Sequence, residues 1–158
     1  MSKIELKNVT KVYDKTNRAI DDLNLIINDG EFFILLGPTG AGKTTILRSI
    51  AGLEKINSGK ILFDDNDYTS VQPAFRDTAF VFQQFSLYPH YKVFDNLAFP
   101  LKSRLRNLSK DAIKEKVEKI AEMLKITSKL NNKATELSGG EMQRVAIGRA
   151  LVRDPNIY

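Results

Sequence analysis

The sequence predicts an α/β fold with a parallel β-sheet core, an N-terminal antiparallel β subdomain and a helical insertion, on three observations. An apolar run at residues 32–36 leads directly into a glycine-rich loop and then a helical pattern, which is typical of a buried parallel strand. Alternating apolar and polar residues at 4–9 and 23–27 predict half-exposed antiparallel strands. Apolar positions at helical spacing between residues 109 and 125 predict an amphipathic helix.

The remaining elements follow from local signals. Further strands are expected at 59–63 and 78–82, and helices at 43–51, around 93–97 and after residue 138. Gly52 should end the first of these helices, and Ser109 should cap the amphipathic one. The acidic turn at 64–67 lacks the glycine and distal glutamate of a calcium loop, so a solvated turn is the expected structure.

Length and composition limit the class of protein. The 158 residues, 42% of them hydrophobic, suit one cored domain. The net charge of +5 suits an anionic ligand, but the basic residues are scattered, so no nucleic-acid partner is expected. The absence of cysteine excludes disulfides and thiolate metal sites and favours the cytosol. No stretch reaches the ~18 apolar residues needed to span a bilayer, so a membrane role would require a partner.

The glycine-rich loop at residues 37–44 fits the phosphate-cradling pattern Gly-x4-Gly-Lys-Ser/Thr. Its glycines let backbone N–H groups point at phosphate oxygens, Lys43 can reach the β- and γ-phosphates, and Thr44 is a natural Mg²⁺ ligand. A plain glycine-rich turn is the alternative, but the full pattern arises by chance in roughly one chain in two hundred of this length. The predicted nucleotide-binding residues are Gly37, Pro38, Thr39, Gly40, Ala41, Gly42, Lys43, Thr44 and Thr45.

A second sequence motif begins at Ser138. Ser138 and Glu141, three residues apart before an apolar run, predict a capping box at a helix start. The cap does not explain Gly139 and Gly140, because glycine costs about 1 kcal/mol in a helix and is tolerated where a backbone approaches something closely. A serine hydroxyl, bare N–H groups and a helix N-terminus together predict a second anion site.

The two motifs together resemble the nucleotide-binding subunit of ATP-binding cassette (ABC) transporters, over the whole chain. This resemblance implies a P-loop NTPase core that binds ATP and Mg²⁺, with a second subunit's Ser138, Gly139, Gly140 and Glu141 closing over the nucleotide. It also implies that Tyr13 stacks on adenine and that Gln83 touches Mg²⁺ and the attacking water. Without the resemblance, a half-buried strand aromatic is the favoured interpretation of Tyr13. Thr44 and Gln83 are then the metal ligands, and Lys43 and Gln83 the catalytic residues.

The resemblance further divides the chain into a nucleotide-binding core (1–83), a helical insertion (84–135) and the signature motif with its helix (136–158). The segment from Gln83 to His90 should contact an integral membrane permease, at the cytoplasmic face of the membrane. Residues 73–77 and 96–102 are most similar to the carbohydrate importers, although polyamine, iron and sulfate importers share much of this pattern. A homodimer or a paired ATPase subunit is implied.

In the family, an apolar strand ending in Asp-Glu follows the signature helix, and here the sequence ends at Tyr158 before that strand. The chain therefore resembles an N-terminal part of the domain that binds ATP without turning it over. Two alternatives stay open: a soluble relative that acts in repair, translation or assembly, and a naturally short nucleotide-binding module that does not hydrolyse ATP.

Overall fold

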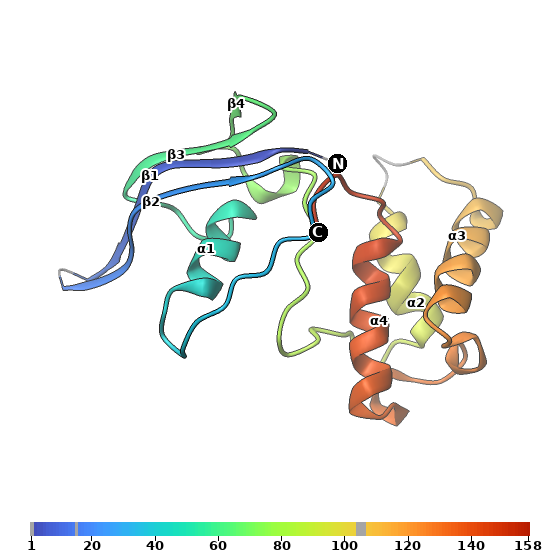
Figure 1. Ribbon diagram of the computed structural model, residues 1–158. Helices are drawn as coiled ribbons and strands as arrows, with labels where there is room; N and C mark the ends of the chain where they lie inside the picture. Colours follow the sequence, from blue (N-terminus) through green and yellow to red (C-terminus); the bar gives the residue numbers. More distant parts are fainter. Residues whose placement is uncertain (1, 15, 104–106) are drawn as a thin grey trace. The chain divides into compact units, whose positions relative to one another are not determined.

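The computed structural model describes residues 2–14, 16–103 and 107–158, which form two compact units (Figure 1). The first unit runs to Thr78 and includes Ile157, and the second comprises residues 79–156 and Tyr158. Each unit has a hydrophobic core of its own. None of the described helices is long and apolar enough to cross a membrane.

The first unit is built on an antiparallel sheet in the order β2-β1-β3-β4 (Figure 1). The strands are β1 (Ile4–Tyr13), β2 (Asn17–Ile27), β3 (Ser58–Phe63) and β4 (Asn66–Asp67). This confirms the predicted antiparallel subdomain, and both β1 and β2 extend beyond the alternating segments that predicted them. Residues 14–16 lie between these two strands, and residue 15 is outside the described part of the chain.

Helix α1 (Lys43–Ile50) supplies part of the core of this unit. Its last residue, Ile50, is buried with apolar side chains of β1, β2 and β3, namely Ile4, Leu6, Val9, Ile20, Ile61 and Phe63. Gly52 follows the helix with a φ of 75°, so the predicted glycine stop is confirmed. A short 3-10 helix, η1 (Pro73–Phe75), lies further along the same unit.

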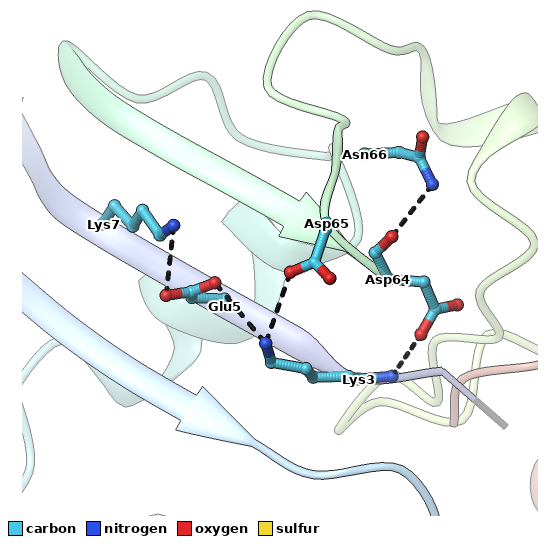
Figure 2. Close-up of polar contacts among 6 residues, drawn as sticks. All are labelled: Lys3, Glu5, Lys7, Asp64, Asp65 and Asn66. Carbon is cyan, nitrogen blue, oxygen red and sulfur yellow. Dashed lines mark hydrogen bonds and ion pairs between the residues drawn. The ribbon is translucent and has the colours of Figure 1, made fainter.

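The acidic turn between β3 and β4 is held by hydrogen bonds and ion pairs to the start of β1 (Figure 2). The backbone N–H of Lys3 donates to Asp64 at 2.9 Å, and the Lys3 ammonium lies 3.3 Å from Asp65. Asp64 and Asp65 both adopt positive φ, and the Asn66 side chain donates to the Asp64 carbonyl. The expected turn is therefore confirmed at Asp64 and Asp65, while Asn66 and Asp67, expected in the same turn, form the short strand β4.

The buried parallel strand expected at residues 32–36 is wrong for this structure, because these residues form no strand. Phe32 and Leu36 are each 89% exposed. A strand needs a hydrogen-bonded neighbour, and no strand of the described residues pairs with this segment. The strand expected at 78–82 is likewise absent, apart from one parallel bridge between Thr78 and Ile157.

The second unit is helical. It contains α2 (Val93–Ala98), α3 (Lys110–Met123) and α4 (Gly139–Leu151), with 3-10 turns η2 (Phe99–Leu101), η4 (Thr127–Lys129) and η5 (Ala134–Glu136). The Ser109 side chain accepts a hydrogen bond from the N–H of Ala112, which confirms the predicted cap of α3. The three helices share one core, whose fully buried members include Val93, Leu97, Val117, Ala121 and Val145.

Candidate nucleotide-binding site

The phosphate loop at residues 37–42 has the backbone that its glycines predict. Gly40 and Gly42 have φ values of 86° and 82°, a region that favours glycine. A Cβ atom at Gly42 would also overlap the carbonyl oxygen of Ala19 in β2. Gly42 is the N-cap residue of α1, so the loop delivers the chain directly to the start of a helix.

The start of α1 has no side-chain cap. The first N–H groups of a helix have no partner within the helix, and α3 and α4 each satisfy one of them with a serine. The ammonium of Lys43 folds back over the loop and donates to the carbonyls of Gly37 and Pro38 at 2.7 and 2.8 Å. The loop therefore places a cation beside uncapped N–H groups, and these residues fit the phosphates of a nucleotide.

Thr44 and Thr45 lie in the first turn of α1, and Thr44 is exposed. Within the described residues, no group of three or more His, Asp or Glu side chains could hold a metal ion. Within the first unit, a magnesium ion here would take the Thr44 hydroxyl and oxygen atoms that come with the nucleotide as ligands.

Tyr13 ends β1 and is half-buried in the same unit as the phosphate loop. The Lys11 ammonium lies over its ring, 4.8 Å from the centroid. Lys11 also forms an ion pair with Glu54 at 2.7 Å. The sequence pattern identified Tyr13 but gave no sign of these two charged neighbours.

The capping box at Ser138 is confirmed. The Ser138 hydroxyl accepts from the N–H of Glu141, and the Glu141 carboxylate accepts from the N–H of Ser138 at 2.8 Å. Lys129 lies 3.1 Å from the same carboxylate. The bonds from Ser138, with a smaller contribution from Lys129, lower the pKa of Glu141 to about 2. Glu141 is therefore tied to its own chain at neutral pH.

Gly139 and Gly140 differ from the other glycine of α4. A Cβ atom at either of them would meet no atom within 4 Å, whereas one at Gly148 would overlap the Leu97 side chain. Packing within the described chain explains glycine at 148 but not at 139 and 140. The two glycines leave the first turn of α4 open to an approaching surface.

Gln83 is exposed in an irregular segment of the second unit. The phosphate loop and Tyr13 belong to the first unit, and Gln83 and Ser138 to the second. The segment around Gln83 is fastened to α4, because the Arg149 guanidinium stacks 4.7 Å from the Tyr88 ring and donates to the Ser86 carbonyl.

Comparison with known proteins identifies the family of the chain. The family described as ABC transporter matches residues 20–158. The chain belongs to this family. It is 48% identical over 155 residues to the sn-glycerol-3-phosphate import ATP-binding protein UgpC of Vibrio vulnificus (strain YJ016), and this match covers 98% of the chain and 41% of the relative. The chain thus spans about two fifths of the length of the curated relatives it matches.

Solved ABC cassettes have the same fold. The dimeric structure of MJ0796, a bacterial ABC transporter cassette, superimposes with a TM-score of 0.85 at 35% identity, covering 96% of this chain and 70% of that one. A post-hydrolysis state of the same cassette bound to ADP and Pi matches at 34% identity, with a TM-score of 0.85 and the same coverage. The α/β fold class of ABC ATPases is therefore confirmed, although the described residues lack the paired parallel strands expected of its core.

Proposed function

We propose that this chain is the nucleotide-binding part of an ATPase subunit that energises an ABC-type membrane importer. ATP binds at residues 37–45 with its adenine on Tyr13, and Mg²⁺ is held by Thr44 and Gln83. The carrying observation is the Lys43 ammonium, which lies 2.7 Å from the Gly37 carbonyl beside an uncapped helix N-terminus. Phosphate oxygens would replace those carbonyls as partners of the ammonium.

A second subunit would complete the site. Ser138, Gly139, Gly140 and Glu141 of one subunit close over ATP held by the other, and the open first turn of α4 supports this role. The dimeric cassette among the structural relatives gives the same support. A homodimer or a paired ATPase subunit is proposed accordingly.

The membrane partner of the subunit is an integral permease. The segment from Gln83 to His90 contacts it at the cytoplasmic face of the membrane. The transported solute is a sugar or a related compound, a proposal supported by curated relatives that carry the name sn-glycerol-3-phosphate import ATP-binding protein. The 158-residue polypeptide alone should bind nucleotide without hydrolysing it, because phosphoryl transfer also needs carboxylates around the metal and the water. The family resemblance assigns these to the strand that follows the signature helix.

The first experiment tests nucleotide binding with Lys43→Ala and a matched control, Lys60→Ala. Lys60 is an exposed lysine of β3 in the same unit, so both changes remove one positive charge. Titration calorimetry with Mg·ATP should show about thirtyfold weaker binding, or ~2 kcal/mol, for Lys43→Ala only. An unchanged dissociation constant in folded Lys43→Ala would refute the phosphate site.

The second experiment tests the shared site in the intact subunit. Ser138→Ala combined with Gly139→Leu should abolish hydrolysis, while ATP binding to the monomer stays within about twofold, since these residues contact the other subunit's nucleotide. Gly148→Leu is the contrasting variant, because its side chain would meet Leu97 inside the unit and should disturb folding. Loss of monomer binding in the first variant would instead indicate a purely structural cap.

A further inference from the structure

Three residues at the end of β1 and after α1 form one connected cluster, which we call the Tyr13 clamp: Lys11, Tyr13 and Glu54. The Lys11 ammonium lies 4.8 Å from the Tyr13 ring centroid, 2.7 Å from the Glu54 carboxylate and 2.8 Å from the Lys55 carbonyl. Lys11 thus links the Tyr13 ring to the Glu54 carboxylate and to the backbone at Lys55.

Glu54 interacts with both other members of the clamp. Its carboxylate lies 2.7 Å from the Lys11 ammonium, and its interaction with Lys11, followed by that with the Tyr13 hydroxyl, lowers the pKa of Glu54. The Lys11 and Glu54 side chains are only 12% and 23% exposed. A pair this shielded is screened less by salt than an ordinary surface pair, so it can hold the ring in place.

The strand itself is shaped around this cluster. The register between β1 and β2 shifts on both sides of Lys11, between Val9 and Lys11 and between Lys11 and Val12. Such irregularities re-aim side chains out of the regular alternation of a strand. Here the side chain that results is a lysine directed over an aromatic ring, where a cation is attracted by the ring electrons.

We propose that Lys11 and Glu54 are positioning residues that fix the Tyr13 ring for stacking on the nucleotide base, an inference that rests on the nucleotide-binding function proposed above. Lys11 covers one face of the ring and the base stacks on the other. A ring already held in its bound orientation loses less conformational freedom when the base arrives, so binding is tighter.

The test separates base binding from phosphate binding by comparing ATP with inorganic tripolyphosphate, which has no base, on the intact protein. Lys11→Met should weaken ATP binding about threefold or more and leave tripolyphosphate binding unchanged. The control is Lys7→Met, which removes the same charge from the same strand at a site paired with Glu5. Lys11→Arg keeps the cation and should retain ATP binding.

A double-mutant cycle distinguishes positioning from folding. In a Tyr13→Ala background, Lys11→Met should cost nothing further for ATP, because the ring it positions is gone. Glu54→Gln, which retains the side-chain volume, should repeat the ATP-specific loss if Lys11→Met fails to fold.

Equal losses for ATP and tripolyphosphate, or additive losses in the cycle, would overturn the clamp while leaving the phosphate site intact. A parent protein that binds neither ligand would refute the proposed function itself, and with it the clamp.

Discussion

Gly42 in the phosphate loop lies against the backbone carbonyl oxygen of Ala19 in β2, so closely that a methyl group at Gly42 would overlap that oxygen. This contact joins the loop to the sheet of the same unit. Two features therefore require glycine at position 42: its φ of 82° and the neighbouring carbonyl of Ala19 in β2.

Gly42→Ala should lower the free energy of unfolding by about 3 kcal/mol, from backbone strain plus overlap. Gly30→Ala is the matched control, since Gly30 has a φ of 73° but no atom within 4 Å of an added Cβ. It should cost only the backbone term of about 1 kcal/mol. Urea unfolding measures both, and equal costs would show that the Ala19 contact relaxes freely.

Arg76 is a buried cation, 4% exposed, that binds backbone carbonyls. Its guanidinium donates at 2.8 to 3.2 Å to four of them, those of Ser49, Ile50, Thr69 and Val71. Two of these belong to the last turn of α1, where a positive charge is favourable. Burial lowers the pKa of this guanidinium.

Arg76→Met should therefore destabilise the protein by about 3 kcal/mol, because the carbonyls lose a charged donor while they stay buried. Arg48→Met changes an exposed arginine of the same helix and should stay within about 0.5 kcal/mol. Thermal or urea unfolding measures the loss of stability in both variants. A small loss for Arg76→Met would mean that water replaces the guanidinium.

Glu141 should make the free energy of unfolding depend on pH in the acidic range. Its pKa is lowered from 4.5 to about 2 in the folded chain, so its contribution is complete above pH 4.5 and is lost as the pH falls from there to about 2. Glu141→Gln removes the charge. The variant should be less stable than the parent at neutral pH, and the difference should vanish near pH 2. A difference independent of pH would contradict this assignment.

The exposed apolar segment at residues 32–36 should promote self-association of the 158-residue polypeptide. Phe32 is 89% exposed beside backbone that pairs with no described strand. Phe32→Lys should reduce aggregation, measured by light scattering. Phe75→Lys is the control, because Phe75 is 70% exposed but lies in the 3-10 helix η1. Equal improvement by both would indicate general surface hydrophobicity as the cause.

Helix ends were predicted well from the sequence. Ser109, Ser138 with Glu141, and Gly52 all occupy the capping positions expected of them, because a cap depends on residues within one turn of each other. The strand at residues 32–36 was predicted wrongly. An apolar run indicates a tendency to be buried, whereas a strand exists only if another strand pairs with it.

The sequence by itself determined the local chemistry: the glycine positions of the phosphate loop, the lysine that follows them, the serine caps and the alternation of β1 and β2. Only the tertiary structure decided which distant groups meet. Lys11 reaches Lys55 across 44 positions, and Arg76 reaches Ser49 across 27. Such contacts depend on the path of the whole chain, including the shifted register around Lys11, and no residue pattern within a few positions carries that information.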